Sequence, residues 1–159
     1  MDNQQEKSIS APQSKPLLVI GILYIVWGVI NALQILLSLV FMDDLAAATL
    51  GYEPDPIFRT IMLRIFIPML VWTAFHIFIG ICCLKNRYKP EGATFLRRLG
   101  IADIVLAVIV PSVLRSLAGG INGVSNFWLM LFMILPLILI GATKKIITAH
   151  EEKLKSGGA

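Results

Sequence analysis

The sequence has few charged residues for its length. Of its 159 residues, 15% are Asp, Glu, Lys or Arg, against about 25% in an ordinary soluble domain. Apolar residues reach 57%, and a chain this short has too little interior to hide that much apolar surface from water. The composition therefore excludes an ordinary soluble domain and predicts an integral membrane protein whose surplus apolar surface faces a lipid bilayer.

Cysteine is also scarce, and the two that occur, Cys82 and Cys83, are neighbours. Adjacent cysteines rarely form a relaxed disulfide, because the bond requires a geometry that sequence neighbours do not reach. The pair therefore gives no indication of an oxidising compartment. Small apolar filler positions within a helix suit these two residues better.

Catalytic, nucleotide-binding and metal-binding motifs are missing. The sequence contains no H-E-x-x-H, G-x-S-x-G, P-loop or G-x-G-x-x-G pattern, and no pair of carboxylates lies within an apolar run. A metal or haem at His76 would need a second ligand, and the other histidine, His150, lies in the C-terminal tail. We therefore expect no enzyme activity, no metal and no cofactor.

What the sequence has instead is four long apolar runs, at residues 17–42, 61–84, 99–117 and 127–143. As a helix, the first run is about 39 Å long, enough to cross the roughly 30 Å hydrocarbon core with some tilt. We expect each run to be one transmembrane helix. The predicted fold class is all-α, a four-transmembrane-helix antiparallel bundle.

The segments around these runs divide the chain into three parts. Residues 1–16 are polar and contain prolines, which predicts a disordered N-terminal segment. Residues 17–143 form the predicted transmembrane domain, in which a short Gly-rich connection at 118–126 makes the last two helices neighbours. Residues 144–159 form a C-terminal tail that we expect to continue as a helix to about Lys155.

Basic residues gather on one side of the predicted bundle. Eleven of the 14 Lys and Arg residues lie in the N-terminal segment, the loop between the second and third runs, and the tail. The positive-inside rule then places both termini in the cytoplasm, in a multi-pass protein of the plasma (inner) membrane. Because these residues flank apolar runs, the net charge of +4 indicates a membrane surface and not nucleic acid.

A weak internal repeat relates the two halves of the chain. Residues 20–30 (IGILYIVWGVI) align with residues 99–109 (LGIADIVLAVI). Gly80 and Gly141 occupy like positions near the ends of the second and fourth runs. The pattern has two interpretations: two tandem helical hairpins of a parallel repeat, or a coincidence of the Ile, Val and Gly that fill most membrane helices.

Polar side chains inside the first two runs form a candidate intramembrane polar site: Asn31, Gln34, Thr73 and His76. His76 lies near the expected bilayer midplane, where charging it is expensive and where its ring needs a partner such as Asn31 or Gln34. One interpretation is a packing seam closed by hydrogen bonds between helices. The other is a site that relays protons or binds a ligand.

Three charged residues of the second and third runs are candidates for charge pairs: Asp103, Arg64 and Arg115. Asp103 is expected near the cytoplasmic boundary, within reach of basic side chains that extend toward the interface: Lys85, Arg87 and Arg98. Arg64 and Arg115 are expected near the opposite boundary. There the acidic loop can neutralise them through Asp43, Asp44, Glu53 and Asp55.

The acidic loop itself is expected to contain a short surface helix. Asp43 or Asp44 is placed to cap a helix through Leu45–Leu50, and Gly51 is placed to end it.

Two functional classes remain open. The first is a non-catalytic accessory, assembly or immunity-type protein that contacts a membrane-protein partner through its helices and surface. The second is an oligomeric transporter or channel subunit with a polar path through Asn31, Gln34 and His76. The scarcity of charge inside the runs favours the first class. The second needs several copies, because a four-helix bundle fills its own interior.

Overall fold

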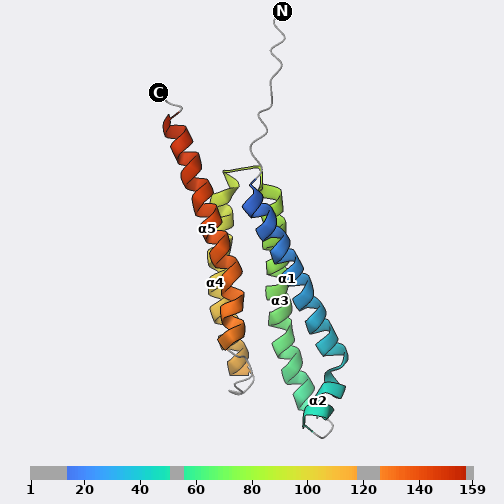
Figure 1. The fold of residues 1–159 in the computed structure, drawn as a ribbon. Coiled ribbons are helices and arrows are strands. Elements are labelled where there is room, and N and C mark those ends of the chain that lie inside the picture. The colour runs from blue at the N-terminus through green and yellow to red at the C-terminus, as the bar shows by residue number, and fades with distance from the viewer. Residues whose placement is uncertain (1–13, 51–55, 118–125, 157–159) are drawn as a thin grey trace, which may run out of the picture.

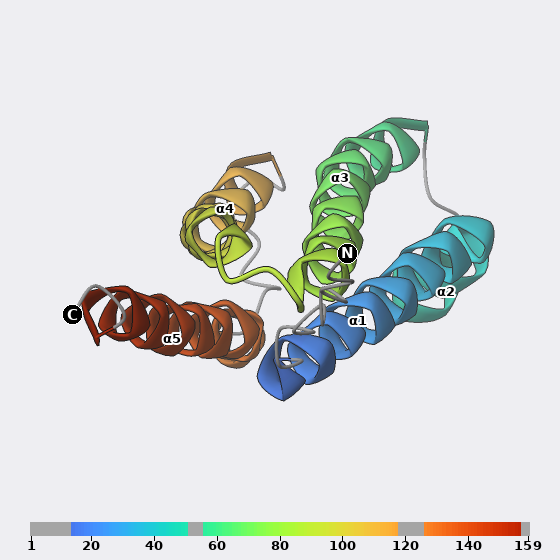
Figure 2. The ribbon, with the colours of Figure 1, turned by 90° about the horizontal axis from the view of Figure 1, so that it is seen from above.

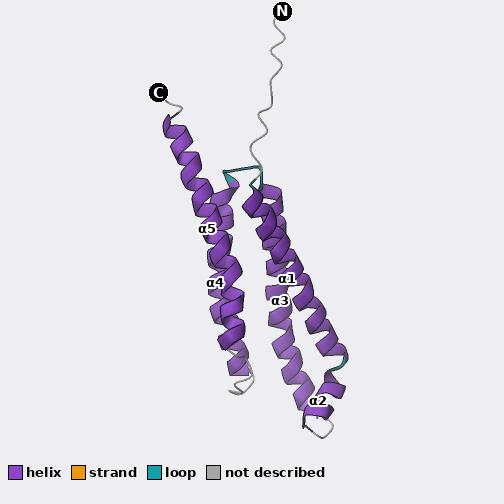
Figure 3. Ribbon diagram, in the orientation of Figure 1, coloured by secondary structure: helices purple, strands orange, loops and turns teal. Residues whose placement is uncertain are grey.

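The computed structural model is all-helical and describes residues 14–50, 56–117 and 126–156 (Figure 1). Within these residues the chain forms five helices, which Figure 3 shows in purple. The all-α prediction is confirmed. The helices are α1 (Lys15–Val40), α2 (Met42–Leu50), α3 (Pro56–Asn86), α4 (Gly92–Leu117) and α5 (Asn126–Ser156).

The four long helices pack in two pairs, α1 against α3 and α4 against α5. Seen from above, α1 and α3 lie on one side and α4 and α5 on the other (Figure 2). Contacts between α3 and α4, and fewer between α1 and α5, join the pairs. The start of α1, the α3–α4 connection and the end of α5 lie at one end of the bundle, while α2 lies at the other (Figure 1).

Among the described residues, three helices are long and apolar enough to cross a membrane. They are Lys15–Val40, Pro56–Asn86 and the Met133–Ser156 part of α5. The helix α4 is not one of the three, so a fourth crossing stays a prediction, and so does the orientation of the bundle in a membrane. The division of the chain into segment, domain and tail also stays a prediction, and residues 1–13 lie outside the described residues.

The outer faces of the helices carry large apolar side chains that the chain itself does not cover. Ile67 is 60% exposed and Val71 is 67% exposed on α3, and similar residues lie along α1, α4 and α5. In water these faces would be unfavourable, whereas hydrocarbon solvates them. The exposed faces therefore support contact with a lipid bilayer.

The interior is a narrow apolar core between the two pairs. Leu17, Ile20 and Ile79 from the first pair meet Leu96 and Leu139 from the second, all almost completely buried. Three prolines lie in the interior of long helices: Pro68 in α3, Pro111 in α4 and Pro136 in α5. Membrane helices tolerate such prolines where neighbouring groups satisfy the freed carbonyl.

Glycines allow α1 and α3 to approach each other closely. A Cβ added to Gly21 would lie 2.9 Å from the carbonyl oxygen of Gly80, and one added to Gly80 would lie 2.7 Å from that of Gly21. Gly28 is equally restricted, with Ile77 Cγ1 at 2.5 Å from the position of its Cβ. These contacts fix α1 on α3 and so set the positions of the polar side chains nearby.

The short helix α2 begins at Met42, slightly earlier than the sequence predicts. Asp43 and Asp44 therefore lie in its first turn, where their negative charge interacts favourably with the positive end of the helix dipole. Arg59 of α3 donates through Nε to Asp43 Oδ1 at 2.9 Å, and this exposed pair ties α2 to α3. Gly51, Glu53 and Asp55 lie outside the described residues.

Candidate intramembrane polar site

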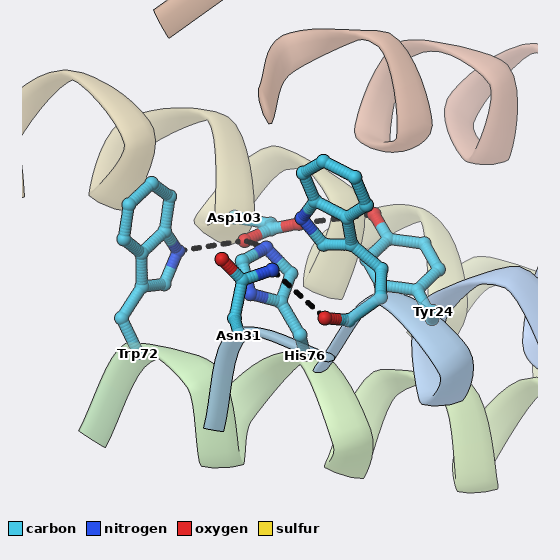
Figure 4. A network of polar contacts seen from close by, with 6 residues as sticks. Tyr24, Asn31, Trp72, His76 and Asp103 are labelled. Atoms are coloured by element: carbon cyan, nitrogen blue, oxygen red, sulfur yellow. Dashed lines mark hydrogen bonds and ion pairs between the residues drawn. The ribbon is translucent and has the colours of Figure 1, made fainter. Parts of the chain in front are cut away.

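Asp103 of α4 is the centre of a buried polar network. Its carboxylate is completely inaccessible to solvent, and three side chains surround it (Figure 4). The Tyr24 hydroxyl donates to Oδ2 at 3.0 Å, and the Trp72 indole nitrogen donates to Oδ1 at 3.2 Å. Nε2 of His76 lies 3.2 Å from the same Oδ1. Both carboxylate oxygens are thus engaged, and the network joins three helices.

The local sequence explains how the three partners meet. Trp72 and His76 are four residues apart on α3, so they share one face of the helix. Tyr24 reaches the site from α1, one turn beyond the glycine contact that holds α1 on α3. The His76 ring contacts both aromatic rings, with centroids 5.2 Å from Trp72 and 5.7 Å from Tyr24.

The site surrounds a buried carboxyl group with polar partners. A carboxylate buried without partners would be very unfavourable, and here three polar groups compensate it. Chemically, such an arrangement can hold a proton, release it, or serve as a fixed polar contact between helices.

The four residues of the predicted polar site occupy different environments. Thr73 and His76 are buried on α3. Asn31 donates to the carbonyl oxygen of Trp27, one turn earlier on its own helix, at 2.8 Å. Gln34 is exposed on the outer side of α1. The acceptor beside Nε2 of His76 is therefore the Asp103 carboxylate, which the sequence placed among the charge pairs.

The partners of Asp103 differ from the basic side chains that the sequence suggested. The helix α4 begins at Gly92, so Asp103 lies about three turns inside it, and its position relative to a membrane boundary stays a prediction. At that depth it faces Tyr24, Trp72 and His76 instead of the three basic residues. Arg64 is exposed on α3, and the side chain of Arg115 lies outside the described part of the chain.

Tyr24 and Trp72 are the members of the network that sequence reasoning did not assign. The spacing of four between Trp72 and His76 is one signal that connects them. The other is the internal repeat, because Tyr24 and Asp103 occupy matching positions in its two halves. If the two hairpins are related by an axis along the bundle, matching residues near that axis meet each other.

Two cavities lie away from this network. The basic-end cavity, of about 310 Å³, lies between the start of α1, the α3–α4 connection and the C-terminal part of α5. The α1 groove, of about 480 Å³, is open and lies along the outer side of α1; its residues are Ile30, Leu33, Gln34, Leu37, Ser38 and Phe41. Neither of the two is lined by a member of the Asp103 network.

Within residues 14–50, 56–117 and 126–156, no group of three or more His, Cys, Asp or Glu side chains is arranged to hold a metal ion. The site is thus a hydrogen-bonded network built from one carboxylate, one imidazole and two aromatic donors. Comparison with known proteins adds no assignment, because no protein-family model, no curated protein and no solved structure matches this chain.

Proposed function

We propose that this chain is a non-catalytic membrane protein that acts by binding a transmembrane helix of another membrane protein through the α1 groove. The observation that carries the proposal is the exposure of Gln34 in that groove. The three helices that are long and apolar enough to span a bilayer support a position within the membrane. The finer assignment, an accessory, assembly or immunity-type role, rests on the same contact.

The depth of Gln34 makes its exposure unfavourable for an isolated chain. It lies six residues before the end of α1, which corresponds to about 9 Å along the helix axis. A primary amide at that depth faces hydrocarbon, where lost hydrogen bonds are not replaced by water. A partner helix that presents an amide or hydroxyl group to Gln34 and Ser38 would satisfy these groups, as polar residues do between membrane helices.

The closed nature of the Asp103 network supports a contact role over a conducting path. Both oxygens of the carboxylate are engaged by side chains of the same chain. The amide of Asn31 donates within its own helix. A path through Asn31, Gln34 and His76 would need these groups to line one continuous opening, whereas Gln34 faces outward from α1.

Photo-crosslinking in native membranes tests the proposal. A photoreactive amino acid is placed at Gln34, inside the groove, and in a matched protein at Val26, an exposed position of α1 outside it. We expect a discrete protein adduct from Gln34 and only lipid adducts from Val26. Gln34→Leu should lower co-purification of the same protein by about threefold to tenfold, because such hydrogen bonds contribute about 1 kcal/mol.

Two outcomes contradict the proposal. Lipid adducts alone at both positions would show that hydrocarbon, and not a partner, covers the groove. Adducts between two copies of the chain would show that the groove binds a second copy and not a different membrane protein. A Val26→Leu variant serves as the control for co-purification, because it changes an equally lipid-facing position without touching the groove.

A second function is favoured by the His76–Asp103 pair itself. Ionisable groups buried among membrane helices often handle protons, so the chain is also a candidate subunit of an oligomeric proton-coupled transporter or channel. In proteoliposomes with a pH-sensitive dye, this function predicts proton movement that Asp103→Asn and His76→Gln abolish while the protein stays folded. Absence of any proton or solute movement in the unaltered protein, under every imposed gradient, would remove this candidate.

A further inference from the structure

The basic-end cavity is lined by both basic and apolar side chains. The basic ones are Arg87, Lys89 and His150, and the apolar ones include Pro16, Leu17 and Ile146. Among the described residues that line it there is no Asp or Glu. The cavity therefore combines positive charge with a surface that accepts hydrocarbon.

Backbone hydrogen bonds give this cavity a defined shape. The amide of Ser14, just before α1, donates to the carbonyl oxygen of Arg87 at 3.0 Å. The amide of Lys89 donates to the carbonyl oxygen of Asn86 at 3.0 Å, which turns the chain at the end of α3. These bonds hold the α3–α4 connection against the start of α1, so the backbone that carries Arg87 and Lys89 has a fixed position.

Arg87 is incompletely satisfied within the described part of the chain. Its guanidinium lies over the ring of Tyr88, with the central carbon 4.6 Å from the ring centroid. Its Nε is buried and has no hydrogen-bond partner there. Arg87 lines the cavity with its other atoms, so an anion there would lie beside the guanidinium and supply the opposite charge that a partly buried cation favours.

We propose that this cavity binds the phosphate-bearing headgroup of an anionic phospholipid. Arginine suits phosphate oxygens because its planar group donates two parallel hydrogen bonds, while Lys89 and His150 contribute further N–H donors. The cavity lies at the ends of apolar helices, the level at which headgroups meet a spanning protein. Its apolar lining accounts for a lipid in preference to a soluble phosphate, because the beginning of an acyl chain can lie on Pro16 and Ile146.

Native mass spectrometry of the purified protein in detergent, titrated with short-chain phosphatidylglycerol and phosphatidylcholine, tests the proposal. We expect one phosphatidylglycerol to be retained at concentrations about tenfold lower than phosphatidylcholine. Replacing Arg87 and Lys89 together by Gln should abolish this preference. Arg87→Lys keeps the charge and should retain part of it, and circular dichroism of each variant verifies that the helices persist.

The matched control replaces Arg97 and Arg98 by Gln. These two exposed arginines lie early in α4, near the same end of the bundle, but do not line the cavity. The control variant should keep the preference for phosphatidylglycerol. An equal loss in the control, equal retention of both lipids by the unaltered protein, or inorganic phosphate displacing the lipid at equal concentration would each overturn the assignment.

Discussion

The two helix pairs use glycine in different ways. In the first pair, Gly21 of α1 and Gly80 of α3 face each other, and added Cβ atoms would stand within 3 Å of backbone oxygen. In the second pair, a Cβ on Gly100 would meet Ile140 Cγ1 at 3.0 Å but a backbone atom only at 3.5 Å, and one on Gly141 would meet nothing within 4 Å. Matching glycines produce a close backbone contact only where both helices present one at the crossing.

The interactions between the pairs differ again from those within them. The first pair packs backbone against backbone, and the second packs side chains such as Leu139 against α4. Between the pairs, the Asp103 carboxylate accepts hydrogen bonds from donors that all belong to the first pair. The polar network therefore determines how one pair is aligned on the other, while glycine determines how tightly the first pair closes.

The largest effect is expected where the pairs meet. Asp103→Leu leaves the donors of Tyr24, Trp72 and His76 without their acceptor in the interior, and should lower the free energy of unfolding by about 3 kcal/mol. Asp103→Asn keeps an acceptor and should lower the free energy of unfolding by about 1 kcal/mol. Unfolding in mixed micelles, followed by tryptophan fluorescence, measures both. A Leu variant as stable as the unaltered protein would show that the network does not align the pairs.

A smaller effect is expected at the crossing of the first pair. Gly80→Ala places a methyl group 2.7 Å from the Gly21 carbonyl oxygen, so α1 and α3 must move apart. We expect a loss of about 2 kcal/mol, the usual range for overpacking a tight contact. The same unfolding assay measures it. Unchanged stability would mean that the two backbones are not in close contact.

The second pair should tolerate the matching changes. Gly100→Ala is expected to lose less than about 1 kcal/mol, because the side chain of Ile140 can shift by the few tenths of an ångström required. Gly141→Ala meets open space and should be neutral or slightly stabilising, since alanine is the better helix former. If Gly141→Ala lowered the free energy of unfolding as much as Gly80→Ala does, close backbone packing would not be confined to the first pair.

The smallest effect is expected at the α2 end of the bundle. Arg59 and Asp43 are each about half exposed, so their ion pair is screened by solvent. Arg59→Gln should change the free energy of unfolding by less than about 1 kcal/mol, and salt should reduce the difference further. A large, salt-independent loss would indicate that this contact is buried from solvent in the membrane.

The positions of the helices could be predicted from the sequence because they depend on local patterns. Apolar runs, their lengths and the positions of Gly and Pro fall within single elements. The helices α3, α4 and α5 contain the last three predicted runs, and α1 covers the first run up to Val40, two residues before its predicted end. The continuation of the tail as a helix is also seen, since α5 extends to Ser156. His76 was singled out for a local reason as well, because an ionisable group in mid-span is conspicuous.

The partners of Asp103 and the exposure of Gln34 could not be predicted from the sequence in the same way. The apolar run that begins at Leu99 locates Asp103 along α4 but does not identify its neighbours on other helices, and the crossing of α4 with α3 brings its carboxylate beside His76. Gln34 lies next to the buried side of α1, which carries Tyr24, Gly28 and Ile35, and how much of α1 a neighbouring helix covers depends on the crossing angle. Such angles follow from contacts between distant residues, which sequence periodicity does not encode.

The most direct test of the four-span topology is cysteine accessibility in intact cells, because it decides whether α4 crosses the membrane. In a background where Cys82 and Cys83 are replaced by Ala, Ser116→Cys near the end of α4 and Glu91→Cys in the α3–α4 connection are labelled with a membrane-impermeant maleimide. The account predicts labelling at position 116 from outside, and at position 91 only after the cells are opened. Protection of both positions in intact cells, or labelling of both, would contradict it.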